Sequence, residues 1–191
     1  MTLSMEPGDA LLIVDVQNDF CPGGALAVPD GDAVVPVINR LIQSAQSAGR
    51  PVFASRDWHP ANHISFQERG GPWPPHCIQE TAGAAFHPDL ALPEEAIIIS
   101  KGTDPDRDQY SAFDGTDLAQ RLTEAEIGRI FVGGLAQEVC VRASVLDGLT
   151  AGFEVHLVAA ATRPVEVDPG YGEQALAEMR EAGAVVEEGP A

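Results

Sequence analysis

Short, almost continuous apolar runs recur along the chain and alternate with longer segments whose apolar residues are spaced as on a helix. The runs predict buried strands at Ala10–Val16, Pro51–Ser55, Ala96–Ser100, Arg129–Val132, Glu154–Ala160 and Ala184–Glu187. The helical spacing predicts helices at Asp32–Ala48, Thr116–Leu122, Val139–Ala151 and Gly172–Ala182. Apolar runs of this length without polar alternation are typical of strands that are covered on both faces.

This order of elements predicts the fold class. Strands that alternate with helices form a parallel sheet, so we expect an α/β fold with a three-layer, doubly wound, mostly parallel sheet and helices on both faces. A length of 191 residues fits one domain over residues 1–191. The segment 56–93 differs, because it has little periodicity and contains four of the five histidines and both tryptophans. We therefore expect an irregular insertion there, which carries a metal site.

Charge and composition exclude several functions. The chain has 11 Lys and Arg against 29 Asp and Glu, a net charge of −18, which disfavours binding to nucleic acid or to anionic membranes. It contains no apolar run of the roughly 18 residues that a membrane span needs, and Met1–Ala10 lacks the pattern of a secretory signal. Three scattered cysteines predict free thiols rather than a disulfide framework. We expect a cytoplasmic protein, and the sequence leaves a homo-oligomer open.

Reactive side chains follow several of the predicted strands. Asp15 lies at the end of the first strand, Asp57 and His59 follow the second, Lys101 follows the third, and Cys140 lies after the fourth. Ligands of open parallel sheets bind beyond the carboxyl ends of the strands, so we expect these five side chains to converge. Each also has an ordinary explanation: an aspartate in a turn, a lysine at a solvated strand end, or a cysteine in the core.

Cys140 has the most specific context among the three cysteines. It follows a Gly-Gly pair at the predicted start of a helix. The helix dipole and a nearby lysine would both favour the thiolate, the reactive form of cysteine. Cys21 and Cys77 lack this context and are interpreted as structural.

The irregular segment contains the candidate metal ligands. Asp57 and His59 are two residues apart, so both can reach one ion from an extended strand end, and His76 would approach from the loop. Imidazole and carboxylate ligands suit zinc, iron or manganese, with zinc preferred here. His63 is a candidate fourth ligand, and Glu68 is a further one. The alternative is that these are ordinary surface histidines.

Six stretches together resemble the nicotinamidases, also called pyrazinamidases, of the isochorismatase-like cysteine hydrolase superfamily. They occur in family order and are Leu12–Phe20, Gly23–Val28, Arg56–Phe66, Trp73–Cys77, Lys101–Thr103 with Tyr110–Phe113, and Gly134–Val141. The most discriminating are the Asp-x-His and Pro-Pro-His motifs, which many members of the superfamily lack. The resemblance spans residues 10 to 145, and Glu173–Met179 also reads like the last helix of the family.

The resemblance implies a role for each matching residue. Asp15, Lys101 and Cys140 would form a catalytic triad, and one divalent metal ion would bind Asp57, His59 and His76. Phe20, Trp73 and Tyr110 would hold the ring of the substrate, with its pyridine nitrogen directed at the metal. The Leu135–Ala136 bond matches a cis peptide of the family. The backbone N–H groups of Ala136 and Cys140 would bind the oxyanion.

The implied reaction converts nicotinamide to nicotinate and ammonia through a thioester, a step of NAD salvage, and would extend to pyrazinamide. One departure bears on substrate range: Gln137-Glu138-Val139 replaces the usual Thr-Asp followed by Tyr or His. Alternatives therefore stay open. They are a cysteine amidase for another small amide, such as a carbamoyl or ureido compound, and a non-catalytic metal-binding module. A rival mechanism uses a metal-activated hydroxide as the nucleophile.

Overall fold

Six strands form one twisted sheet in the order β3-β2-β1-β4-β5-β6. The computed structural model describes residues 4–166 and 168–188. The strands are β1 (Asp9–Val14), β2 (Val52–Asp57), β3 (Ile97–Lys101), β4 (Arg129–Gly134), β5 (Glu154–Thr162) and β6 (Val185–Glu187). Each neighbouring pair in this sheet is parallel. The predicted α/β fold is confirmed, and its described sheet is wholly parallel.

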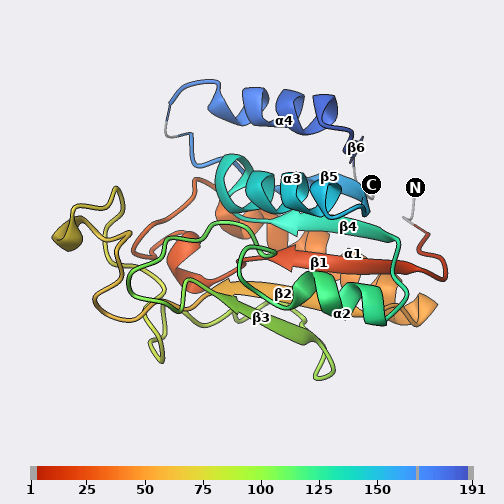
Figure 1. The fold of residues 1–191 in the computed structure, drawn as a ribbon, viewed down its shortest axis with the longest axis horizontal. Helices are drawn as coiled ribbons and strands as arrows, with labels where there is room; N and C mark the ends of the chain where they lie inside the picture. Colours follow the sequence, from red (N-terminus) through yellow and green to blue (C-terminus); the bar gives the residue numbers. More distant parts are fainter. Residues whose placement is uncertain (1–3, 167, 189–191) are drawn as a thin grey trace.

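Helices cover both faces of the sheet, which makes the predicted three layers (Figure 1). They are α1 (Val35–Ala48), α2 (Leu118–Glu124), α3 (Arg142–Thr150) and α4 (Tyr171–Glu181). Successive residues of β1 point to opposite faces: Leu11 and Ile13 pack in the same core as α1, whereas Leu12 and Val14 pack in the core of the other three helices. β1 is buried along its whole length, as the uninterrupted apolar run predicts.

The ends of several elements differ from the predicted ones. β1 ends at Val14, two residues early, because Asp15 adopts a left-handed backbone with φ of +49°. The predicted helix Val139–Ala151 is in fact two elements, since a π-helical turn at Gln137–Val141 precedes α3. A 3₁₀ turn at Gly31–Val34 likewise precedes α1.

The segment between β2 and β3 is irregular, as expected. Its longest regular piece is a 3₁₀ turn at Gln67–Arg69. Figure 1 shows this yellow-to-green segment beyond the carboxyl ends of the strands, where it covers the sheet edge. No helix within residues 4–166 and 168–188 is long and apolar enough to cross a membrane.

A partly buried ion pair links the first residues of β1 and β4. Arg129 donates from Nε to Asp9 Oδ1 at 2.8 Å and from Nη2 to Asp9 Oδ2 at 2.6 Å. The Glu6 backbone N–H adds a third hydrogen bond to Asp9 Oδ2. Burial acts to raise the pKa of Asp9, but these hydrogen bonds outweigh it and hold that pKa below its ordinary value.

Replacing Arg129 should destabilise the fold in a pH-dependent way. We expect Arg129→Gln to lower the free energy of unfolding at pH 7 by roughly 1–3 kcal/mol, because it leaves a buried carboxylate poorly paired. A depressed pKa stabilises the folded state above the unfolded value of about 3.9 and loses that effect as the pH falls through the folded pKa. The difference from wild type, measured by urea unfolding, should therefore shrink below about pH 4.

Arg121→Gln is the matched control, because Arg121 pairs with Asp117 on the surface of α2 with both side chains about half exposed. Exposed pairs of this kind contribute little, so this variant should unfold like wild type. A difference for Arg129→Gln that stays constant from pH 7 to about pH 3 would contradict the assignment.

Candidate active site

The ends of three strands bring Asp15, Lys101 and Cys140 together. Asp15 follows β1, Lys101 ends β3, and Cys140 lies in the π-helical turn after β4. Lys101 Nζ lies 2.8 Å from Asp15 Oδ2 and donates to Cys140 Sγ at 3.5 Å. Oxygens of Asp15 and Asp57 and the sulfur of Cys140 lie within 4.8 Å of one another. The predicted convergence at one sheet edge is confirmed.

Asp15 has an unusual backbone conformation, which orients its carboxylate. A non-glycine residue with positive φ is uncommon, and such residues gather at functional sites. The N–H of Asp15 donates to the Ser55 carbonyl at 3.1 Å, and Ser55 Oγ donates to Asp15 Oδ1 at 2.7 Å. Asp15 Oδ2 contacts the ammonium of Lys101 but has no aligned hydrogen-bond donor among the described residues. This oxygen is therefore available to accept a proton from Cys140.

Burial and mutual charge set the protonation of this cluster. Burial raises the pKa of Asp15, although the Lys101 ammonium opposes it. Burial acts to lower the pKa of Lys101, but Asp15 and Asp57 hold that pKa well above its usual range. Lys101 therefore stays charged inside the protein, where paired carboxylates are the condition for burying an ammonium.

The features expected to favour a thiolate at Cys140 are opposed by its surroundings. Burial raises the pKa of the Cys140 thiol well above its usual value, and the two carboxylates add to the effect against the opposing charge of Lys101. The predicted helix start is also a π-helical turn, so α3 begins two residues after Cys140. These effects favour the thiol over the thiolate, so activation of Cys140 needs a base. Burial likewise raises the pKa of Cys21 to about 11 and that of Cys77 well above the usual range.

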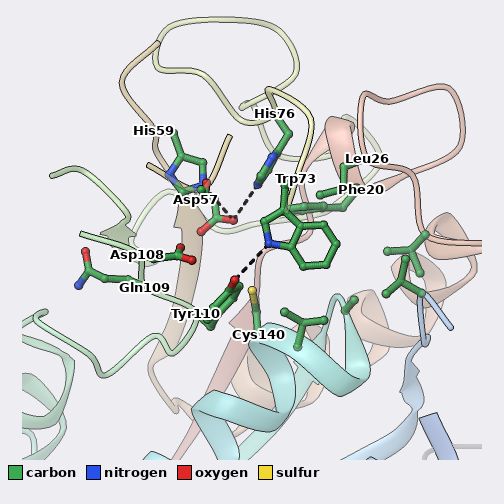
Figure 2. A pocket seen from close by; sticks show the side chains of 15 residues that line it. Phe20, Leu26, Asp57, His59, Trp73, His76, Asp108, Gln109, Tyr110 and Cys140 are labelled. Atoms are coloured by element: carbon green, nitrogen blue, oxygen red, sulfur yellow. Dashed lines mark hydrogen bonds and ion pairs between the residues drawn. The ribbon is translucent and has the colours of Figure 1, made fainter. Parts of the chain in front are cut away.

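Asp57, His59 and His76 form a buried group suited to a metal ion. One ligand atom from each lies within 4.8 Å of the others. His59 Nε2 lies 3.4 Å and His76 Nε2 3.8 Å from the same oxygen, Asp57 Oδ2 (Figure 2). Their Nδ1 atoms contact the carbonyls of Gly102 and Pro74 at 2.9 and 2.8 Å. Because a carbonyl only accepts, Nδ1 carries the proton in each ring and Nε2 offers a lone pair to the ion.

Sequence reasoning missed Gln17, which fixes the backbone of this group. Gln17 is fully buried; its Nε2 donates to the carbonyls of Asp57 and Ala84, and its Oε1 accepts the Asp57 N–H at 2.8 Å. Asp19 supports the other side, because its Oδ2 accepts the N–H of Cys77, next to His76. A glutamine directly after the predicted strand Ala10–Val16 is the sequence signal that could have identified Gln17.

His63 lies beside the metal group and is not part of it. Its ring stacks on that of His59 with centroids 4.1 Å apart. Its Nδ1 contacts Ser65 Oγ at 2.7 Å and its Nε2 contacts the Arg107 carbonyl at 3.0 Å, so both ring nitrogens already have partners. Glu68, the other candidate ligand, is exposed.

The three predicted aromatic residues line one pocket together with the metal group and Cys140. Trp73 Nε1 donates to Tyr110 Oη at 3.2 Å, and the ring of Phe20 lies against that of His76 with centroids 5.6 Å apart. Figure 2 shows the labelled side chains gathered around the sulfur. Aliphatic side chains complete the wall: Leu26, Val28, Val139 and Val165.

The residues that depart from the family pattern fasten the loop that carries Val165. Glu138 is buried, and its carboxylate accepts the backbone N–H groups of Val165 at 3.1 Å and Glu166 at 2.7 Å. Gln137 donates from its backbone to the Arg163 carbonyl and from Nε2 to that of Gly172. Val139, the next residue, lines the pocket where the family usually has an aromatic ring or histidine.

The chain turns sharply before Cys140. The Leu135–Ala136 bond is cis, as the resemblance implies. Gly134 precedes it with φ of +135°, and a Cβ there would lie 2.0 Å from the Val14 carbonyl oxygen, so only glycine fits. Among the described hydrogen bonds, none uses the N–H of Ala136, which lines the pocket beside Cys140.

Fold and site together define a parallel α/β protein in which an Asp-Lys-Cys cluster adjoins a metal-binding Asp-His-His group. A family model described as the isochorismatase domain matches residues 9–189. The chain belongs to the isochorismatase family, which confirms the resemblance of its motifs.

Individual relatives are similar over almost the whole chain. Nicotinamidase of Escherichia coli (strain K12) is 43% identical and covers 94% of both chains. The crystal structure of pyrazinamidase of Pyrococcus horikoshii in complex with zinc has a TM-score of 0.91 at 50% identity and covers 94% of this chain and 98% of that one. PnC1 from L. infantum in complex with nicotinate has a TM-score of 0.87 at 37% identity and covers 97% and 96%.

Gln17 provides a test of how the metal group is held. Gln17→Leu keeps the size of the side chain but removes three hydrogen bonds, two of them to the backbone of Asp57. Loss of such a support typically weakens metal binding by about 10–100-fold, and we expect that loss for Zn²⁺ in a competition titration with a chromophoric chelator.

Gln120→Leu is the control, because Gln120 is exposed on α2 and its Nε2 bonds Glu124. This variant should bind Zn²⁺ like wild type. Unchanged affinity in Gln17→Leu, with a native circular dichroism spectrum, would show that Gln17 does not support the metal group.

Proposed function

We propose that the protein is a metal-dependent amidohydrolase that converts nicotinamide to nicotinate and ammonia, with pyrazinamide as a second substrate. The observation that carries the proposal is the Asp15–Lys101–Cys140 cluster beside a buried Asp-His-His group in one aromatic pocket. The names of the relatives, nicotinamidase and pyrazinamidase, support this choice of substrates.

In the proposed mechanism Asp15 is the base and Cys140 the nucleophile. Asp15 Oδ2 accepts the thiol proton as the sulfur attacks the carboxamide carbon. Its protonated form then gives that proton to the leaving nitrogen, so ammonia departs and a thioester remains. Water, deprotonated by Asp15, attacks the thioester and releases nicotinate, and the proton returns to the sulfur. Lys101 stays charged and favours the thiolate as it forms.

The backbone N–H groups of Ala136 and Cys140 are proposed to bind the oxyanion of each tetrahedral intermediate. The absence of a described acceptor for the Ala136 N–H supports this role. A donor aimed at a developing oxyanion contributes on the order of 3 kcal/mol in other enzymes. Ala136 follows the turn around Gly134 and lines the same pocket as Cys140, which also supports this role.

We propose that Asp57, His59 and His76 hold Zn²⁺. Their buried ligand atoms and the carbonyl-bound Nδ1–H groups fit this ion, and the related pyrazinamidase was solved with zinc. Bound there, the ion would act as a Lewis acid toward the pyridine nitrogen of the substrate. Phe20, Trp73 and Tyr110 then hold the flat ring so that its carboxamide faces Cys140.

Substitution of Cys140 separates this mechanism from the rival one with a metal-activated hydroxide. Cys140→Ala removes the nucleophile, so we expect ammonia release from nicotinamide to fall by at least about a thousandfold while Zn²⁺ binding persists. Cys21→Ala is the control, because Cys21 is buried outside this pocket, and it should keep wild-type turnover. Wild-type ammonia release by Cys140→Ala would end the cysteine mechanism.

A panel of small amides in the same assay tests substrate class. The pocket has the aliphatic Val139 where the family usually has an aromatic residue, so other amides stay candidate substrates. Carbamoyl and ureido compounds therefore belong in the panel. We expect the highest kcat/KM for nicotinamide and pyrazinamide. Preference for a ureido compound, or no turnover of any amide, would overturn the proposed substrate.

Removal of the metal should lower activity reversibly. Dialysis against a chelator is expected to reduce kcat/KM for nicotinamide at least tenfold, mainly through KM, because the ring loses its anchor. Added Zn²⁺ should restore activity in wild type but not in Cys140→Ala. Full activity in a metal-free protein, verified by elemental analysis, would contradict a metal-dependent enzyme.

A further inference from the structure

Asp108 is an acidic residue of the pocket with no role in the proposed mechanism. It lines the pocket with Cys140, Asp57 and Tyr110, and Figure 2 shows it on the side of the pocket formed by Gln109 and Tyr110. Its side chain is exposed to solvent. No Lys, Arg or His within residues 4–166 and 168–188 forms an ion pair with it.

The neighbouring carboxylates of the same loop differ from Asp108 in this respect. Asp106 pairs with Arg69 at 3.0 Å, and Asp114 pairs with Arg107 at 2.5 Å. Neither of them lines the pocket. Asp108 is thus the carboxylate of this loop that lines the pocket and that no described cation pairs with.

The charge of Asp108 acts on Tyr110, which lines the pocket. Burial raises the pKa of Tyr110 to about 12, and the nearby carboxylate adds to this against the hydrogen bond from Trp73. The charge of Asp108 therefore reaches a ring that faces the pocket.

The proposed reaction changes the charge of its ligand. The carboxamide is neutral, whereas the product is a carboxylate that forms at Cys140 next to the Lys101 ammonium. Lys101 pairs there with Asp15 and Asp57, so the anionic product does not meet an unopposed positive charge. A further carboxylate that lines the pocket repels the anionic product and leaves a neutral carboxamide almost unaffected.

We propose that Asp108 is a specificity-determining residue that weakens binding of the carboxylate product relative to the neutral carboxamide and so promotes product release. This inference rests on the proposed function. A charge across a solvated pocket acts through a high effective dielectric, so the expected effect is about threefold to tenfold at low salt. It acts on the anion and leaves the affinity for a neutral ring of the same shape nearly unchanged.

The test compares Asp108→Asn with Asp108→Glu and with Asp106→Asn. In Asp108→Asn, the inhibition constant of nicotinate should fall about threefold to tenfold, while kcat/KM for nicotinamide changes less than about twofold. Asp108→Glu, which keeps the charge, and Asp106→Asn, which lies outside the pocket, should resemble wild type. The difference should diminish as ionic strength rises from about 20 mM to about 500 mM.

Three results would contradict the proposed role of Asp108. An unchanged inhibition constant in Asp108→Asn, or an equal change in nicotinamide and nicotinate affinity, would overturn the role of Asp108. An effect that persists at high salt would also overturn it, because it would not be a screened charge effect. Wild-type turnover of nicotinamide is measured first, so failure of the proposed function appears there and is distinct from failure at Asp108.

Discussion

The buried ammonium of Lys101 is the interaction on which the rest of the site depends. It lies 2.8 Å from Asp15, 2.5 Å from Asp57 and 3.5 Å from the sulfur of Cys140, with its side chain fully enclosed. A charge removed from water in this way is tolerated only when partners surround it. Because those partners come from β1, β2 and the turn after β4, the ion cluster also fixes the spacing of the strand ends. Loss of the Lys101 ammonium would leave two buried carboxylates uncompensated, so catalytic groups and fold stability depend on the same charge.

The strand order explains why these residues meet. The chain runs from β1 outward to β2 and β3, then returns to place β4 on the other side of β1. Such a reversal leaves a crevice at the carboxyl ends of the two central strands, which is where ligands of doubly wound sheets bind. Asp15 follows β1 and Cys140 follows β4, so base and nucleophile flank that crevice. The irregular segment after β2 then covers it with Trp73 and His76, which supplies the aromatic wall that no strand end provides.

Strand positions and the main site residues were predictable because their signals are local. A buried parallel strand needs an apolar run, and a reactive residue after such a run must lie at the sheet edge. The support of the site was not predictable, because Gln17 and Glu138 act through backbone groups 40 and 27 or 28 residues away. The pKa of Cys140 was also not predictable from the sequence: its helix start and a nearby lysine were expected to lower that pKa, whereas burial and two carboxylates raise it. His63 was a candidate fourth ligand in the sequence, and the fold gives both of its ring nitrogens other partners.

The charges of the cluster also link the metal group to the protonation of Cys140. Asp15 and Asp57 together carry two negative charges against the single positive charge of Lys101, and this excess of negative charge works with burial to hold Cys140 protonated. The two oxygens of Asp57 face different partners, since Oδ1 accepts from Lys101 and Oδ2 lies against the imidazoles of His59 and His76. A divalent cation held on the Oδ2 side would change this sum from minus one to plus one and would favour both thiolate and oxyanion. Asp57 therefore belongs to both halves of the site: Oδ1 pairs with Lys101, and Oδ2 faces the histidines of the metal group.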